Sequence, residues 1–136
     1  MYELFEHTAD LGLRVRAADL AGLFRDAAHG LFAMIVEPPP AGSPVRRIPF
    51  ELAGERYDFL LFDWLNELLY VFDSQRMLLG RFAVTIDGFR LQASAEGFPL
   101  DAGPYRLLHE VKAITYHGLR VERTGDGWLA EVIVDI

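Results

Sequence analysis

The sequence has 136 residues, of which 51% are hydrophobic and 24% are charged, with a formal net charge of −7 and no cysteine. This length predicts one domain over residues 1–136, and the lack of cysteine excludes thiolate metal ligands, a disulfide framework and a cysteine nucleophile. The acidic balance argues against direct nucleic-acid binding and favours either a basic protein partner or a cation.

Two strand-like runs at the start of the chain flank a short polar segment. Residues 11–17 alternate between apolar and polar side chains, which is typical of a half-buried strand, and residues 1–5 form the run before them. Between the runs, residues 7–10 read His-Thr-Ala-Asp, where an ordinary turn would carry glycine or proline. Asp10 is therefore either a turn residue or part of a binding site, and His7 is either a core histidine or part of that site.

Two amphipathic helices are predicted on either side of a proline-rich loop. The first follows Asp19, a good N-cap, and carries an apolar stripe at i, i+3, i+4 and i+7 spacing over residues 20–35. Four prolines within residues 37–44 exclude helix and central strand there. Residues 47–52 then predict a strand near a sheet edge, and residues 56–75 predict a second striped helix, which we expect to be the more buried one.

The remainder of the chain is predicted to be rich in strands. Residues 82–95 form a hairpin about Asp87-Gly88, since Asp-Gly is a strong hairpin turn signal. Further strands are expected at residues 110–117, 119–122 and 128–134. This order of elements predicts an α+β fold, a single two-layer domain in which two amphipathic helices pack on one face of a mixed β-sheet.

Several common sites are excluded by their motifs. The sequence contains no GxGxxG, Walker, HExxH or GxSxG motif, so no nucleotide-binding loop or familiar hydrolase centre is predicted. Its four histidines include no i, i+4 pair that would indicate a helical zinc site. No apolar run approaches the roughly 18 residues of a membrane span and no secretory signal opens the chain, so we expect a cytoplasmic protein without membrane contact.

Two features of the last third lack a simple structural account. The chain stays strand-like to its last residues, where Asp135 places a carboxylate beside the α-carboxylate of Ile136. Two such charges repel unless a cation or donor lies between them, although Asp135 could simply end a strand while Ile136 packs into the core. Lys112 interrupts an apolar strand, where alternation groups it with Ile114 and Tyr116, so it should snorkel or pair.

Four segments together resemble the archease family. They are EHTADLGLRV at residues 6–15, WLNELLY at 64–70, EVKAITYHGLRVER at 110–123 and VDI at 134–136. The segments occur in the family's order and span nearly the whole chain. Phrases such as EHTAD, KAITYH and the terminal DI have no common structural reason to occur in one sequence.

The resemblance implies a protein cofactor of an RtcB-type RNA ligase, which joins RNA ends in tRNA splicing and other tRNA processing. Such a cofactor activates the ligase by promoting its guanylylation and multiple turnover, and is not itself an enzyme. The resemblance also implies metal binding by Asp10, Asp135 and Ile136. Their hard oxygens suit calcium, the ion most expected in a structure, with Mg²⁺ and Mn²⁺ as alternatives. His7 and Lys112 are candidate contacts to the ligase.

The sequence departs from the family pattern at two positions and leaves two other functions open. Phe98 stands where members often carry a glutamate after the glycine aligned with Gly97, and Tyr105 stands where they often carry a histidine. The same carboxylates could serve a stand-alone metal-dependent hydrolase or nuclease, or a chaperone-like scaffold with a structural cation. Purified protein acting alone on RNA would favour the hydrolase.

Overall fold

A computed structural model describes residues 1–7 and 10–136 of the chain. The α-helices of this part are α1 (Leu20–Ile35) and α2 (Tyr57–Gln75), and a 3-10 turn, η1, spans Leu100–Ala102. The strands are β1 (Tyr2–His7), β2 (Asp10–Ala17), β3 (Val36–Glu37), β4 (Arg46–Ala53), β5 (Met77–Asp87), β6 (Arg90–Pro99), β7 (Arg106–Leu107), β8 (Ala113–Ile114), β9 (Arg120–Thr124) and β10 (Gly127–Asp135). Neither α-helix is both long and apolar enough to span a membrane, a finding that covers only the described residues.

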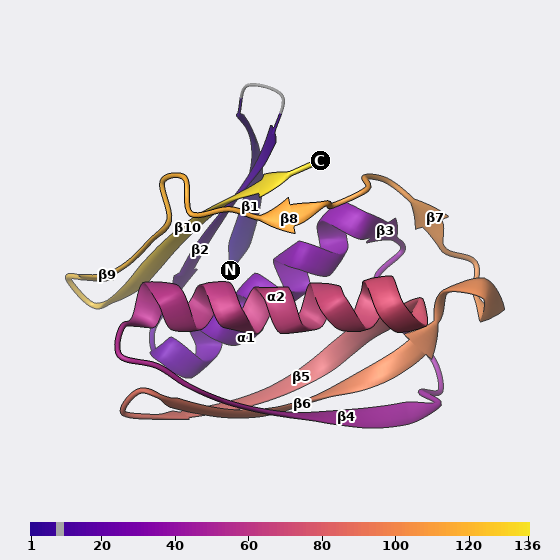
Figure 1. The fold of residues 1–136 in the computed structure, drawn as a ribbon, viewed down its shortest axis with the longest axis horizontal. Helices are drawn as coiled ribbons and strands as arrows, with labels where there is room; N and C mark the ends of the chain where they lie inside the picture. The colour runs from indigo at the N-terminus through magenta and orange to yellow at the C-terminus, as the bar shows by residue number, and fades with distance from the viewer. Residues whose placement is uncertain (8–9) are drawn as a thin grey trace.

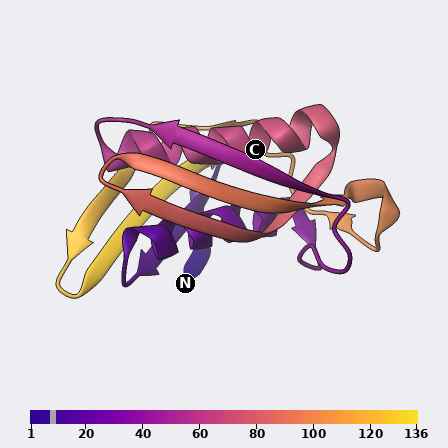
Figure 2. The same ribbon diagram turned by 90° about the horizontal axis from the view of Figure 1, so that it is seen from below.

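The strands form two larger sheets with both helices between them (Figure 1). One sheet has the order β1-β2-β10-β8, with β9 also paired to β10, and the other has the order β4-β6-β5; β3 and β7 pair separately. Seen from below, the three-stranded sheet lies across the helices on the side away from the β2–β10 sheet (Figure 2).

The predicted α+β class is confirmed, but the single mixed sheet with helices on one face is wrong. Each strand pairing in the described part of the chain is antiparallel, and the hairpins β1–β2, β5–β6 and β9–β10 join neighbouring strands directly. A helix with apolar residues on more than one side is covered from more than one side. The apolar surface of α1 is wide enough to meet β5 on one side and β2 on the other.

α1 is more deeply buried than α2, contrary to expectation. It begins after Asp19, whose side chain accepts a hydrogen bond from the Gly22 amide at 2.7 Å, as the N-cap prediction required. Gly30 lets the β1–β2 hairpin approach closely, since a Cβ there would overlap the side chain of Leu13. α2 instead keeps one polar and aromatic stripe in solvent.

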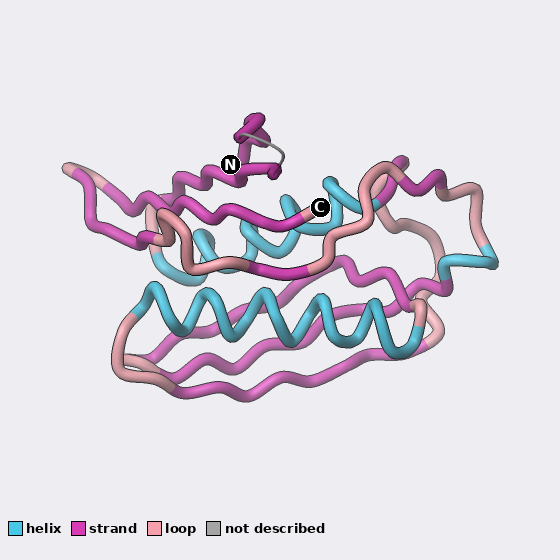
Figure 3. Tube along the Cα trace, turned by 45° about the horizontal axis from the view of Figure 1, so that its top comes forward, coloured by secondary structure: helices cyan, strands magenta, loops and turns pink. Residues whose placement is uncertain are grey.

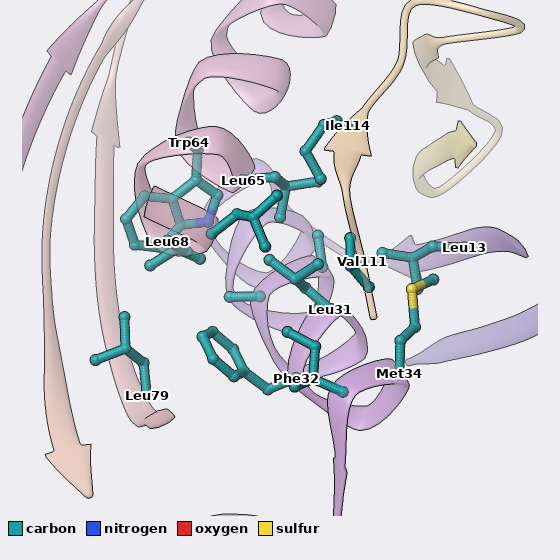
Figure 4. Packing of buried hydrophobic residues seen from close by; sticks show 14 of the residues in the cluster. Leu13, Leu31, Phe32, Met34, Trp64, Leu65, Leu68, Leu79, Val111 and Ile114 are labelled. Carbon is teal, nitrogen blue, oxygen red and sulfur yellow. The ribbon is translucent and has the colours of Figure 1, made fainter. Parts of the chain in front are cut away.

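The core lies between the two sheets and includes the segment next to the chain end. Trp64 is fully buried, and its indole Nε1 donates to the Phe24 carbonyl at 3.0 Å, which ties α2 to α1. Figure 4 shows Ile114 beside Leu65 of α2 and Val111 beside Leu31 of α1. The core therefore fixes the position of β8, which borders the end of β10.

The strand predicted over residues 110–117 is wrong in extent. Only β8 is strand, and the flanking residues form a loop beside α2. Ile114 is buried while Tyr116 is 62% exposed, so the two do not share a face as alternation predicted. Burial of Val111 and Ile114 explains the apolar pattern without a continuous ladder.

Candidate functional site

The start of β2 and the end of β10 bring two predicted site residues together. In the antiparallel register of these strands, Asp135 lies directly opposite Asp10, and Ile136 follows at the C-terminus (Figure 1). Cross-strand residues of this kind point to the same face, with Cβ atoms roughly 4.5–5.5 Å apart. Residues separated by 125 positions in the sequence thus present two carboxylates at one point of the sheet.

Both carboxylates belong to the face of the sheet that points away from the helices. Along β2, Leu11 and Leu13 are buried in the core, so Asp10 and Gly12 alternate to the outer face. The ring of Phe5 lies so close over Gly12 that an added Cβ would overlap it. Asp10 is partly buried and Asp135 is exposed, so a ligand can reach the pair from solvent.

A second row of charges on the same face shows how opposite signs are normally arranged. Arg14 donates to Glu3 at 3.1 Å and to Glu131 at 2.9 Å, and Arg120 Nε donates to Glu131 at 2.8 Å. Charges alternate across the four strands of this row. In the row of Asp10 and Asp135, two carboxylates face each other, and a cation bound between them would offset their repulsion.

Glu131→Gln should lower the free energy of unfolding at neutral pH. It should also make this free energy less dependent on pH in the acid range. Burial alone would raise the pKa of Glu131, but hydrogen bonds from Arg120 and Arg14 outweigh it and hold the pKa below the ordinary value of 4.5. The carboxylate therefore stabilises the fold above that value, and the contribution is lost as pH falls through the lowered pKa. We expect a loss of about 1 kcal/mol at pH 7, measured by urea unfolding.

The wild type and Glu131→Gln should converge in stability as the pH falls through the lowered pKa of Glu131, because the wild-type carboxyl is then protonated. Equal unfolding free energies at every pH would mean that the alternating row contributes nothing.

Backbone hydrogen bonds hold the chain end in place. The Lys112 amide donates to the Asp135 carbonyl at 2.7 Å, and the Thr115 amide and hydroxyl donate to the Ile133 carbonyl at 3.0 and 2.8 Å. Ile136 is half-buried and packs against the core, so its side chain serves as an anchor whatever its terminal oxygens do. Lys112 is exposed beside this ladder, as a partner contact requires.

The fit of this pair to a divalent cation rests on two side chains. Among residues 1–7 and 10–136, no group of three or more His, Cys, Asp or Glu side chains converges on one point. The α-carboxylate of Ile136 would add a third hard-oxygen donor beside Asp10 and Asp135. Calcium accepts six to eight oxygens, including backbone carbonyls and water, so such a donor set suits it. The side chain of His7, and Thr8 and Ala9, lie outside the described residues.

Comparison with known proteins identifies the family. Residues 2–136 match the model of the Archease protein family (MTH1598/TM1083). The chain is 39% identical over 140 residues to the protein archease of Pyrococcus furiosus, with 99% of this chain and 98% of that protein covered. The chain belongs to the archease family. The protein archease of Methanopyrus kandleri is 35% identical over 139 residues, with 99% of each protein covered.

Solved structures of the archease family share the fold. The solution structure of Methanobacterium thermoautotrophicum protein 1598 superposes with a TM-score of 0.86 at 30% identity, covering 99% of this chain and 98% of that one. The crystal structure described as an archease, possible chaperone, from Thermotoga maritima gives a TM-score of 0.68 at 21% identity, with 100% and 98% covered. At 21% identity, the similarity to the Thermotoga maritima structure concerns the fold alone.

The two departures from the archease pattern have structural roles here. Phe98 is buried in the core. The Tyr105 hydroxyl donates to the Ala41 carbonyl at 3.2 Å and accepts from the Ala41 amide at 3.1 Å, which ties its loop to the proline-rich loop. Neither side chain is among the groups that border Asp10 and Asp135 in the sheet register.

Proposed function

We propose that this protein is an accessory cofactor that activates an RtcB-type tRNA- and RNA-splicing ligase in the cytoplasm by promoting guanylylation and multiple turnover. Membership of the archease family supports the general role. The observation that carries the proposal is the register that sets Asp10 opposite Asp135 on a solvent-facing surface, although like charges there are unfavourable. Two carboxylates that meet from distant parts of the chain offer hard oxygen donors to a divalent cation.

In this proposal, Asp10, Asp135 and the α-carboxylate of Ile136 hold one divalent cation. When bound, the ion supplies a fixed positive charge with coordination positions left open to a partner. The protein's own contribution is rigidity. The Lys112 amide donates to the Asp135 carbonyl, and β10, the strand of Asp135, is paired with β2. Lys112 adds an exposed cation next to the pair, suited to an anionic group of the ligase complex.

Ligase guanylylation tests the proposal directly. Purified RtcB-type ligase, radiolabelled GTP and divalent ion are incubated with and without this protein, and the covalent GMP adduct is followed with time. We expect faster adduct formation and more than one joined RNA per ligase molecule in its presence, and no joining by this protein alone. An adduct that forms equally fast in both reactions would overturn the proposal.

The same samples separate the two alternative functions. A hydrolase or nuclease would shorten labelled RNA without ligase. A scaffold of the kind suggested by the words "possible chaperone", used for the Thermotoga maritima structure, would prevent heat aggregation of the ligase without changing the rate of adduct formation.

A further inference from the structure

The solvent-facing stripe of α2 combines aromatic rings with carboxylates. Phe59, Asp63, Glu67 and Tyr70 follow one another along this side of the helix, and all four are exposed. Phe59 is 44% exposed and Tyr70 is 66% exposed. The helix carries four carboxylates over residues 57–75 and no lysine or arginine.

The loop of residues 107–117 widens this stripe into a surface. It runs beside α2 (Figure 3), and the ring of Tyr116 stacks on Phe62 with centroids 3.9 Å apart and meets Phe59 at 5.8 Å. At the other end of the helix, the exposed Leu107 and Leu108 line a cavity of about 270 Å³. Exposed apolar groups gathered in this way mark interaction sites.

At both ends of α2, an arginine of the chain itself lies over an aromatic ring of the helix. The Arg56 guanidinium lies 4.5 Å from the ring centroid of Phe59 and donates to Asp58 at 2.6 and 3.1 Å. Arg76 lies 4.8 Å from the ring centroid of Phe72. A ring beneath a guanidinium and a carboxylate at its edge form a favourable site for arginine.

The middle of the stripe repeats this pairing without its own cation. Within the described part of the chain, no lysine, arginine or histidine forms an ion pair with Asp63 or Glu67, and Tyr70 lies on the same side of the helix. Cation–π and ion-pair groups of this kind remain available to another molecule.

We infer that the middle of the α2 stripe, Asp63, Glu67 and Tyr70, docks an arginine-rich protein surface, with Phe59 and Tyr116 as its apolar border. The inference rests on the proposed function, because an RNA ligase needs such a basic surface to hold phosphates. The position fits, since the loop of residues 107–117 contains β8, and β8 pairs with Asp135 through Ala113. A partner held on the stripe is thus next to β8, the strand that pairs with the end of β10.

A matched charge-reversal experiment tests this surface. Binding of the RtcB-type ligase to immobilised protein is measured for the wild type, for Asp63→Lys with Glu67→Lys, and for Asp126→Lys with Glu51→Lys. Asp126 and Glu51 are exposed carboxylates on the β9–β10 turn and on β4, so both double variants change the net charge equally. We expect the α2 variant to bind roughly 10- to 100-fold more weakly, and the control to remain near the wild type.

Tyr70→Ser tests the surface without a change of charge. It removes an exposed ring that is not part of the core, and it should weaken binding as well. Equal loss in both double variants would reduce the effect to net charge, and no loss in either would remove the surface from the interface; both results overturn the inference. The proposed function fails separately, when wild-type protein binds the ligase yet leaves GMP-adduct formation unchanged.

Discussion

Asp10→Asn is expected to abolish ligase activation while leaving the metal-free protein folded. The substitution removes one of two like charges that face each other across β2 and β10, and such a pair is destabilising by up to about 1 kcal/mol. Asparagine keeps one acceptor oxygen and nearly the same shape, and no core contact is lost. Function should therefore be lost while the fold is retained.

Calcium separates the two effects. A cation that binds only the folded wild type raises its unfolding free energy, by about 2.7 kcal/mol at a hundredfold excess over the dissociation constant. The thermal unfolding temperature of Asp10→Asn should respond little to the same addition, and the GMP adduct should form at the rate seen without cofactor. Asp126→Asn, which removes an exposed carboxylate from the β9–β10 turn, serves as the control and should behave as the wild type.

Two outcomes would contradict this account of Asp10. A folded Asp10→Asn protein that activates the ligase fully would make Asp10 an ordinary turn residue. A large loss of stability without calcium would show that the carboxylate holds the hairpin together.

Local patterns were sufficient for the helices and hairpins. The N-cap at Asp19, the apolar stripes of α1 and α2 and the turn after Asp87 each depend on residues close in sequence, and the structure confirms all of them. The division into two sheets depends on which faces of α1 meet a partner. An apolar stripe in the sequence does not indicate how many sheets pack against the helix, and the prediction of a single sheet is therefore wrong.

The candidate site was predictable in its members but not in its geometry. The resemblance to the archease family pointed to Asp10, Asp135 and Ile136, and only the antiparallel register places Asp10 opposite Asp135. The alternating row through Arg14 and Glu131 was missed for the same reason. Alternation in β2 and β10 predicts that Arg14 and Glu131 point outward. It does not predict which strands lie next to each other in the sheet.

The chain end offers the sharpest prediction, because its two carboxylates can be altered one at a time. Asp135→Asn should weaken calcium binding by more than the roughly 10- to 100-fold that is typical of losing an outer-shell partner. A C-terminal tag converts the Ile136 α-carboxylate into an amide, whose neutral carbonyl can still ligate. The tagged protein should therefore bind calcium more weakly than the untagged protein but more tightly than Asp135→Asn.

An N-terminal tag is the natural reference for this comparison, provided that affinity and not stability is compared. The Met1 ammonium pairs with Asp26 and donates to the Arg16 carbonyl at 2.9 Å, so a tag there alters contacts of α1 and β2. These contacts lie at the other end of β2 from Asp10, and calcium affinity should not change. Calorimetric titration of the four proteins, with GMP-adduct formation alongside, gives the ranking. If the C-terminally tagged protein binds calcium and activates the ligase as well as the untagged one, the terminal carboxylate is not a ligand; if Asp135→Asn does so too, the cation is held elsewhere.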